Sequence, residues 1–77
     1  MKDLLYFLVS NLVRNKEALQ VEEIKDKGTY VLRIIADDKD YGKIIGKNGR
    51  VIQSIRTLIR VYAINNNLRA VVKVGKN

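Results

Sequence analysis

The chain has 77 residues, of which 47% are hydrophobic, and this length leaves room for one domain with one core, expected to span residues 1–77. It contains neither cysteine nor histidine, so it lacks the usual zinc ligands, disulfides and general bases, and we expect a protein without a metal, cofactor or enzymatic activity. Its net charge of +7 favours an anionic partner.

The N-terminal half predicts a helix followed by two strands. Apolar residues between Leu4 and Leu12 recur with the i, i+3, i+4, i+7 spacing of an amphipathic helix, which we expect over residues 2–14. Alternation over residues 18–25 predicts a strand, with a bulge or strong twist where the alternation slips at Glu23-Ile24. After a glycine-containing turn, residues 29–36 predict a strand that is apolar on both faces and therefore central in its sheet.

The C-terminal half predicts two helices and a last strand. The carboxylates of residues 37–40 are expected to cap a short helix over residues 41–45. A long helix is expected from residue 49 or 50 to about residue 64, and a last strand over residues 69–74. The core-facing arc predicted for the long helix consists of Val51, Ile52, Ile55, Leu58, Ile59, Tyr62 and Ala63.

The order α-β-β-α-α-β predicts an α+β fold with a mixed three-stranded sheet and three helices on one face. The two strands that flank the helix pair need a crossover connection, so we expect them to be parallel neighbours with a right-handed crossover. The hairpin then places an antiparallel strand on the other side of the central strand.

Nothing in the sequence predicts secretion or membrane insertion. The apolar run from Leu4 to Val9 is too short for a signal peptide, and Asp3 precedes it. No segment approaches the roughly 20 apolar residues that a membrane span requires. We therefore expect a cytoplasmic protein that makes no membrane contact.

The charged residues are distributed unevenly along the chain. All eight acidic residues lie at or before Asp40, so the first part carries a net charge of −1 and the second part a net charge of +8. Such asymmetry predicts a polyanion bound mainly by the C-terminal half, although a solvated surface that aids solubility is the alternative. The bases of the second part are Lys43, Lys47, Arg50, Arg56, Arg60, Arg69, Lys73 and Lys76.

A loop with two glycines, Gly46-Lys47-Asn48-Gly49, joins the two predicted helices. Free backbone N–H groups and the positive dipole end at the start of the second helix would form an anion site. Glycine lets a phosphate backbone approach closely, and Lys43, Lys47 and Arg50 add positive charge. The tetrapeptide alone also fits a tight Asn-Gly turn or the turn of a DNA-binding helix-turn-helix motif.

The loop lies within a longer segment, Gly42 to Leu58, which resembles the signature of KH domains: an apolar pair, GxxG, and an isoleucine shortly after. This segment closely resembles the small single-KH RNA-binding proteins of bacteria known as the KhpA family, and the resemblance extends over nearly the whole chain. It implies a type II KH fold and an RNA-binding protein without catalytic activity. It also implies a role as an RNA chaperone or a post-transcriptional regulator.

The resemblance also implies which residues contact RNA. In KH domains the GxxG loop clamps the backbone of about four unpaired nucleotides, and Lys47 is the leading candidate for a phosphate contact. Ile45 and Ile52 are candidates for the floor of a base-binding groove, with burial in the core as the alternative. Arg56 and Arg60 would extend the phosphate track or belong to a solvated helix face. The predicted RNA-binding residues are Lys43, Ile45, Gly46, Lys47, Asn48, Gly49, Arg50, Ile52 and Arg56.

Two further hydrophobic residues, Val61 and Ile64, fall outside the apolar arc of the long helix and predict a protein interface. The family resemblance implies a homodimer or a heterodimer with a larger KH-containing protein. Arg69 and Lys73 share one face of the last strand, without an assigned role. Two alternatives to single-stranded RNA binding stay open: an interaction or dimerisation module with weak or no RNA affinity, and single-stranded DNA binding.

Overall fold

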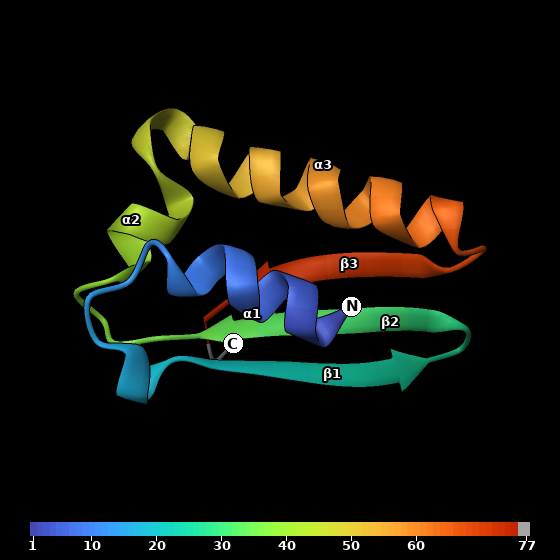
Figure 1. Ribbon diagram of the computed structural model, residues 1–77, viewed down its shortest axis with the longest axis horizontal. Coiled ribbons are helices and arrows are strands. Elements are labelled where there is room, and N and C mark those ends of the chain that lie inside the picture. Colours follow the sequence, from blue (N-terminus) through green and yellow to red (C-terminus); the bar gives the residue numbers. More distant parts are fainter. Residues whose placement is uncertain (76–77) are drawn as a thin grey trace.

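All three α-helices lie on one face of a three-stranded sheet in the computed structural model, which describes residues 1–75 (Figure 1). Lys76, one of the eight bases of the second part, lies outside the described residues. The elements in chain order are α1 (Lys2–Ser10), the 3-10 helix η1 (Lys16–Ala18), β1 (Gln20–Asp26), β2 (Thr29–Ile35), α2 (Tyr41–Ile45), the 3-10 helix η2 (Lys47–Gly49), α3 (Arg50–Asn65) and β3 (Arg69–Val74).

The sheet has the order β1-β2-β3, with β1 antiparallel and β3 parallel to the central strand β2. This confirms the predicted α+β fold, the element order and the central position of residues 29–36. Of the two alternatives predicted at Glu23-Ile24, a bulge or a strong twist, the bulge is wrong, because pairing between β1 and β2 runs without interruption. Glu23 occupies a helix-facing position and accepts a hydrogen bond from the backbone N–H of Lys2 (3.1 Å). Ile24 consequently lies on the open face of the sheet, 58% exposed.

The hydrophobic core lies between the sheet and the helices. β2 contributes Leu32 and Ile34 at its centre, both fully buried, and α2 contributes Ile44. Burial of such aliphatic side chains stabilises a domain by roughly 1.5–3 kcal/mol each. The remaining core residues are Leu5, Val9, Val13, Leu19, Val21, Ala36, Ile52, Ile55, Ile59 and Val72.

The first helix is shorter than predicted and ends at Ser10. The hydroxyl of Ser10 and the amide of Asn11 both donate hydrogen bonds to the carbonyl of Phe7 (3.0 and 2.7 Å), which satisfies one of the last carbonyls of the helix. Val13 is nevertheless buried, so the apolar spacing continues past the helix end because the following loop also packs on the core.

The long helix has its predicted bounds to within one residue, but its buried face is narrower than predicted. Ile52, Ile55, Ile59 and Ala63 are buried, whereas Leu58 and Tyr62 are 53% and 41% exposed. The helix α1 has nine residues and α3 has sixteen, so α1 is too short to cover the whole of the adjacent flank of α3. No helix among residues 1–75 combines the length and apolar character needed to cross a membrane.

Candidate nucleic-acid interface

The GxxG segment forms a tight protruding turn between α2 and α3 (Figure 1). Gly46 ends α2 with φ 76° and ψ 175°, and its N–H donates to the carbonyl of Gly42 (2.8 Å). Asn48 and Gly49 then adopt left-handed conformations with φ 57° and 73°. Three departures from helical geometry therefore separate the two helices, and they set the angle at which α3 leaves the loop.

The two glycines of the loop are needed for different reasons. A Cβ atom on Gly46 would overlap the side chain of Val51 and lie 2.7 Å from its Cβ atom, so the first turn of α3 packs directly on the glycine backbone. A Cβ atom on Gly49 would meet no heavy atom within 4 Å. Glycine is therefore needed at position 49 only for the left-handed conformation. At position 46 it is needed both for the unusual dihedral angles and for the close contact with Val51.

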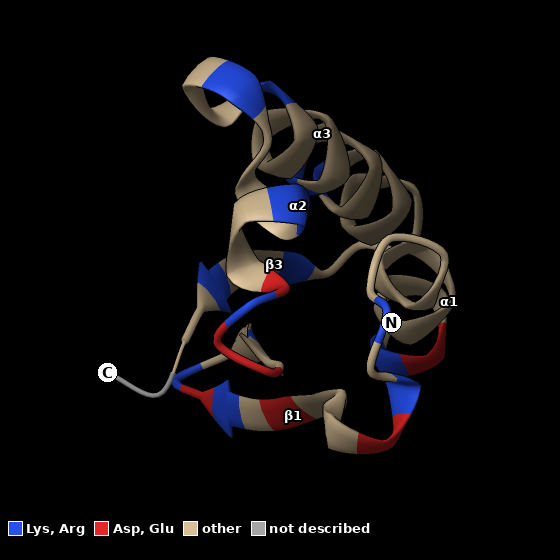
Figure 2. Cartoon of the chain, turned by 90° about the vertical axis from the view of Figure 1, so that its left-hand side faces the viewer, with Lys and Arg blue, Asp and Glu red and all other residues tan. Residues whose placement is uncertain are grey.

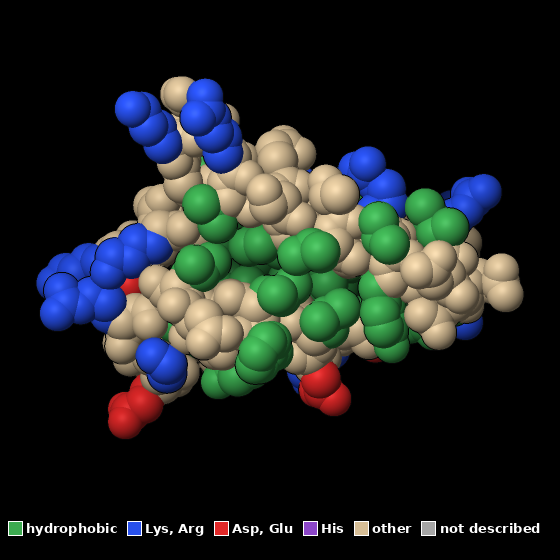
Figure 3. Space-filling view, turned by 45° about the horizontal axis from the view of Figure 1, so that its top comes forward, with side chains coloured by type: hydrophobic (Ala, Val, Ile, Leu, Met, Phe, Trp, Pro, Cys, Tyr) green, Lys and Arg blue, Asp and Glu red, His purple; other side chains and the backbone are tan. Residues whose placement is uncertain are grey.

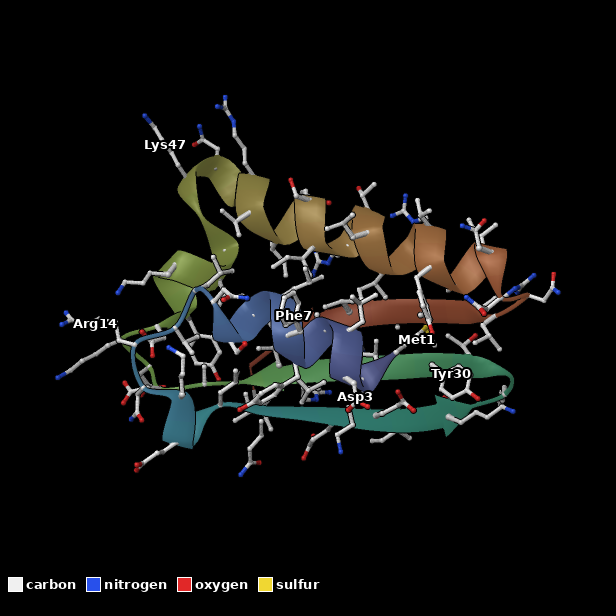
Figure 4. All side chains as sticks on the ribbon, in the orientation of Figure 1. Met1, Asp3, Phe7, Arg14, Tyr30 and Lys47 are labelled. Atoms are coloured by element: carbon white, nitrogen blue, oxygen red, sulfur yellow. The ribbon has the colours of Figure 1, made fainter. Side chains whose placement is uncertain are left out.

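Positive charge gathers at the tip of this turn. Lys47 extends away from the body of the protein, and basic residues mark the loop in the cartoon and space-filling views (Figures 2, 3 and 4). The N-terminus of α3 has no side-chain cap and no acidic residue in its first turn. The N–H of Arg50 donates to the carbonyl of Lys47. The positive end of the helix dipole and the charges of Lys47 and Arg50 together form a site that suits a phosphate group.

The isoleucines predicted to floor a groove are placed in different environments. Ile45 is 40% exposed beside the loop and remains available for contact with a base. Ile52 is only 5% exposed and packs in the core with Ile44 and Ile55, which corresponds to the alternative of burial in the core. We therefore retain Ile45 as the candidate for base contact and assign Ile52 to the support of the loop.

The basic residues predicted on α3 face the edge strand β3. The guanidinium Nε of Arg56 donates a hydrogen bond to the carbonyl of Val72 (3.2 Å), which ties the middle of α3 to the free edge of β3. Arg60 lies one turn further along and is exposed. Lys43 is exposed on α2. The predicted polar contacts therefore lie on α2, the loop and the β3-facing side of α3.

Asp40 connects the N-terminal part of the chain to the helix that carries the loop. The sequence predicts that its carboxylate caps α2, and that prediction is wrong: Asp40 is the N-cap residue, but no side-chain cap bond forms. Its carboxylate instead accepts hydrogen bonds from the backbone N–H groups of Arg14 (3.1 Å) and Asn15 (3.0 Å). The side chain is nearly fully buried, so these bonds lock the loop that follows α1 against α2.

The pKa values of two carboxyls are lowered at this junction. Hydrogen bonds from the backbone N–H groups of Asn15 and Arg14 lower the pKa of Asp40 below its ordinary value of 3.8. The pKa of Asp37 is lowered by the backbone N–H of Lys39 and by the side-chain amide of Asn15. Because the folded state favours both charged forms, the stability that they contribute is complete above the unfolded pKa and is lost as pH falls through the folded pKa.

We expect the Asp40→Asn variant to be less stable than the parent at neutral pH and less sensitive to acid. The amide can accept a hydrogen bond through one atom only, and it has no carboxyl proton to gain. Urea unfolding midpoints measured at neutral pH and below pH 3.8 would reveal both effects. An equal loss of stability on acidification in the parent and the variant would contradict the role assigned to this carboxylate.

Two features of the structure had no signal in the sequence pattern. The bonds from Asp40 reach a loop 25 and 26 residues away in the chain, and no local motif indicates them. The exposure of Leu58 and Tyr62 depends on how much of α3 is covered by α1. Both features depend on tertiary contacts between segments that are distant in the chain.

Comparison with known proteins agrees with the geometry. A family model described as "KhpA/KhpB, KH domain" matches residues 2–74. A protein of Chlamydia caviae named RNA-binding protein KhpA is 36% identical over 74 residues, covering 96% of this chain and 95% of its own length. The proteins of the same name from Clostridium acetobutylicum (36% identical, 96% and 99% covered) and Aquifex aeolicus (31% identical, 96% and 94% covered) are similar over comparable lengths.

Proposed function

Because the chain belongs to the KhpA/KhpB KH-domain family, we propose that residues 1–77 form a single KH domain that binds unpaired RNA at its GxxG loop and has no enzymatic activity. RNA binding is the activity that the names of its relatives record. The proposed contacts are the backbone of residues 46–49, Ile45 and four basic side chains: Lys43, Lys47, Arg50 and Arg56.

The observation that carries this proposal is the geometry of the loop. A helix N-terminus without a side-chain cap follows a glycine turn that leaves the backbone accessible, and two cations lie at the tip. Among residues 1–75, the two ion pairs within 4.0 Å involve Glu22 and Glu23, so neither cation at the tip is neutralised by an acidic partner. Such a site holds phosphates without reading a base, which fits a clamp on the RNA backbone.

The experiment that tests the proposal reverses charge in the loop, with Lys47→Asp and Asn48→Asp combined, and measures binding to unpaired RNA. Loss of RNA binding in a folded protein supports the clamp. A matched single-stranded DNA competitor in the same assay tests whether the site discriminates the two sugars. Unchanged RNA binding would favour the alternative of an interaction module without RNA affinity at this loop.

A dimer completes the proposal, because one KH domain contacts few nucleotides and gains avidity from a second copy or a larger KH-containing partner. The surface that we assign to this contact is the helix patch, defined by Phe7, Leu58, Val61 and Tyr62. Ile64, the other residue predicted at an interface, lies outside this patch and lines a hollow with Arg60 and Leu68 on the β3 side of α3. All four side chains of the patch are exposed, and hydrophobic groups gather on this side of α1 and α3 in the space-filling view (Figure 3). An apolar area shared by two helices is typical of a protein contact.

We expect Leu58→Asp to weaken self-association by roughly tenfold or more, because a charge at the centre of an apolar interface loses its hydration. Sedimentation equilibrium over a range of concentrations measures the effect. Gln20→Asp is the control, since Gln20 is exposed on β1 and does not belong to the helix patch. A parent protein that stays monomeric at high concentration, or a Leu58→Asp variant that associates as the parent does, would refute the homodimer.

We further propose that the protein acts in the cytoplasm as an RNA chaperone or post-transcriptional regulator. A backbone clamp with little base recognition suits many transcripts, since phosphate contacts give affinity without sequence information. Weak single-site binding combined with dimerisation would let the protein exchange between RNA molecules.

A further inference from the structure

One face of the sheet carries no helix. All three α-helices lie on the opposite face, and no α-helix or strand among residues 1–75 packs over this one, which we call the open face (Figure 1). The strand register aligns Ile24 of β1, Val31 of β2 and Val71 of β3 in one row across it. Ile24 and Val71 are exposed, and none of the three belongs to the hydrophobic core. Such a row of aliphatic side chains is a surface of the kind that protein contacts use.

The charged side chains on either side of this apolar row are sorted by strand. On one side, a row formed by Glu22, Arg33 and Lys73 runs from β1 through β2 to β3. On the other side, Asp26 lies on β1 and Arg69 occupies the corresponding position on β3. The outer strand β1 is therefore acidic on the open face, and the outer strand β3 is basic.

This pattern is self-complementary for two copies of the chain that pack with their open faces together. A two-fold axis parallel to the strands places β1 of one copy over β3 of the other and keeps each row at its level along the strands. Glu22 of one copy then faces Lys73 of the other. Asp26 faces Arg69 in the same way, and Val31 meets its own counterpart at the axis. Two sheets commonly pack in this aligned manner, about 10 Å apart.

Two repulsive contributions oppose this contact, and both are reduced. Arg33 also lies at the axis, but its Nε is 4.0 Å from the carboxylate of Glu22, and its guanidinium donates a hydrogen bond to the carbonyl of Gly75 (3.0 Å). Its charge is thus partly compensated within each copy. The net charge of +7 on each copy is screened beyond about 8 Å at physiological ionic strength, whereas the acid–base pairs act at contact distance.

The size of the open face indicates how strong the contact can be. Three strands about 4.8 Å apart, with seven residues at about 3.3 Å each, form a face of roughly 14 by 23 Å. Stable interfaces bury about 800 Å² on each partner, which is more than this face offers. Association through it should therefore be weak and should depend strongly on protein concentration.

We propose that the open face is a self-association surface, on which a second copy packs with the acids of its β1 against the bases of β3. It lies on the side of the sheet opposite the helix patch, so one molecule can use both surfaces at once. Two such contacts per molecule build assemblies larger than a dimer. This inference does not depend on RNA binding at the loop.

The test uses Val31→Cys, because the chain has no cysteine and the new thiol is the only one. Every variant also carries Leu58→Asp, which removes the contact through the helix patch. A short bismaleimide crosslinker is expected to give a covalent dimer whose yield increases with protein concentration. Glu22→Lys or Lys73→Glu alone should lower this yield roughly fivefold or more, because the two-fold axis repeats each pair. The two reversals together should restore it.

The restoration is specific to contact between copies, since β2 separates Glu22 from Lys73 within one chain. Asn65→Cys, exposed at the end of α3 on the helix side, is the matched control for the thiol. Circular dichroism checks that each variant is folded. A crosslinking yield for Val31→Cys no higher than that of the control, or a double reversal no better than the single ones, would overturn the proposal. A crosslink that forms only with another protein would assign the face to a different partner and would also overturn it.

Discussion

A protein carrying Lys47→Asp and Asn48→Asp is expected to lose about a hundredfold or more in affinity for unpaired RNA. The change removes the cation at the tip of the loop and sets two carboxylates where phosphates would lie, and like-charge contacts cost several kcal/mol. About 3 kcal/mol corresponds to a hundredfold change in affinity. Fluorescence anisotropy with a labelled oligonucleotide, at one stated salt concentration, measures the loss.

The fold of this double variant should be retained. Both side chains are exposed, and aspartate tolerates the left-handed conformation of residue 48 nearly as well as asparagine does. A charge-matched control combines Lys2→Asp with Gln20→Glu, which lowers the net charge by the same three units at exposed positions on α1 and β1. If the control loses as much affinity as the loop variant, then binding depends on total charge and the loop is not the site.

Gly46→Ala is expected to destabilise the domain by about 3 kcal/mol or more. The region around φ 76° and ψ 175° is nearly exclusive to glycine and costs other residues roughly 1–3 kcal/mol. The added Cβ would also overlap the side chain of Val51, so α3 must shift at its first turn. Total stability for a chain of this length is about 4–12 kcal/mol at typical values per residue, so urea unfolding should detect the loss easily.

Two other glycines provide an internal comparison for this result. Gly49→Ala should cost only about 1–2 kcal/mol, because the left-handed conformation is strained but the space around it is free. Gly42→Ala, inside α2 with free space and no positive φ, should be neutral or stabilising by up to about 1 kcal/mol. Adding Val51→Ala to Gly46→Ala should restore part of the stability. Equal effects of Gly46→Ala and Gly49→Ala would contradict the packing of Val51 on the loop.

Much of the candidate site could be predicted because its signals are local. The glycine spacing, the cations on either side of it and the helical periodicity that follows are all contained between Gly42 and Leu58. Loop geometry of this kind depends on residue types that tolerate positive φ, and the structure has positive φ at Gly46, Asn48 and Gly49. The element order and the central strand could be predicted for the same reason. The spacing of hydrophobic residues and the positions of turn residues are both visible within short segments of the sequence.

The sequence by itself determined the α-β-β-α-α-β order, the GxxG turn and the acid-free second part. Only the tertiary structure decided that Ile52 is buried while Ile45 is exposed, that the Asp40 carboxylate binds the loop after α1, and that Arg60 and Arg69 line one hollow. It also decided that Leu58 and Tyr62 stay uncovered. The physical reason is that periodicity shows which side of a helix or strand is apolar. Whether that side is buried depends on the length and position of the neighbouring helix or strand, which are set by contacts between residues distant in the chain.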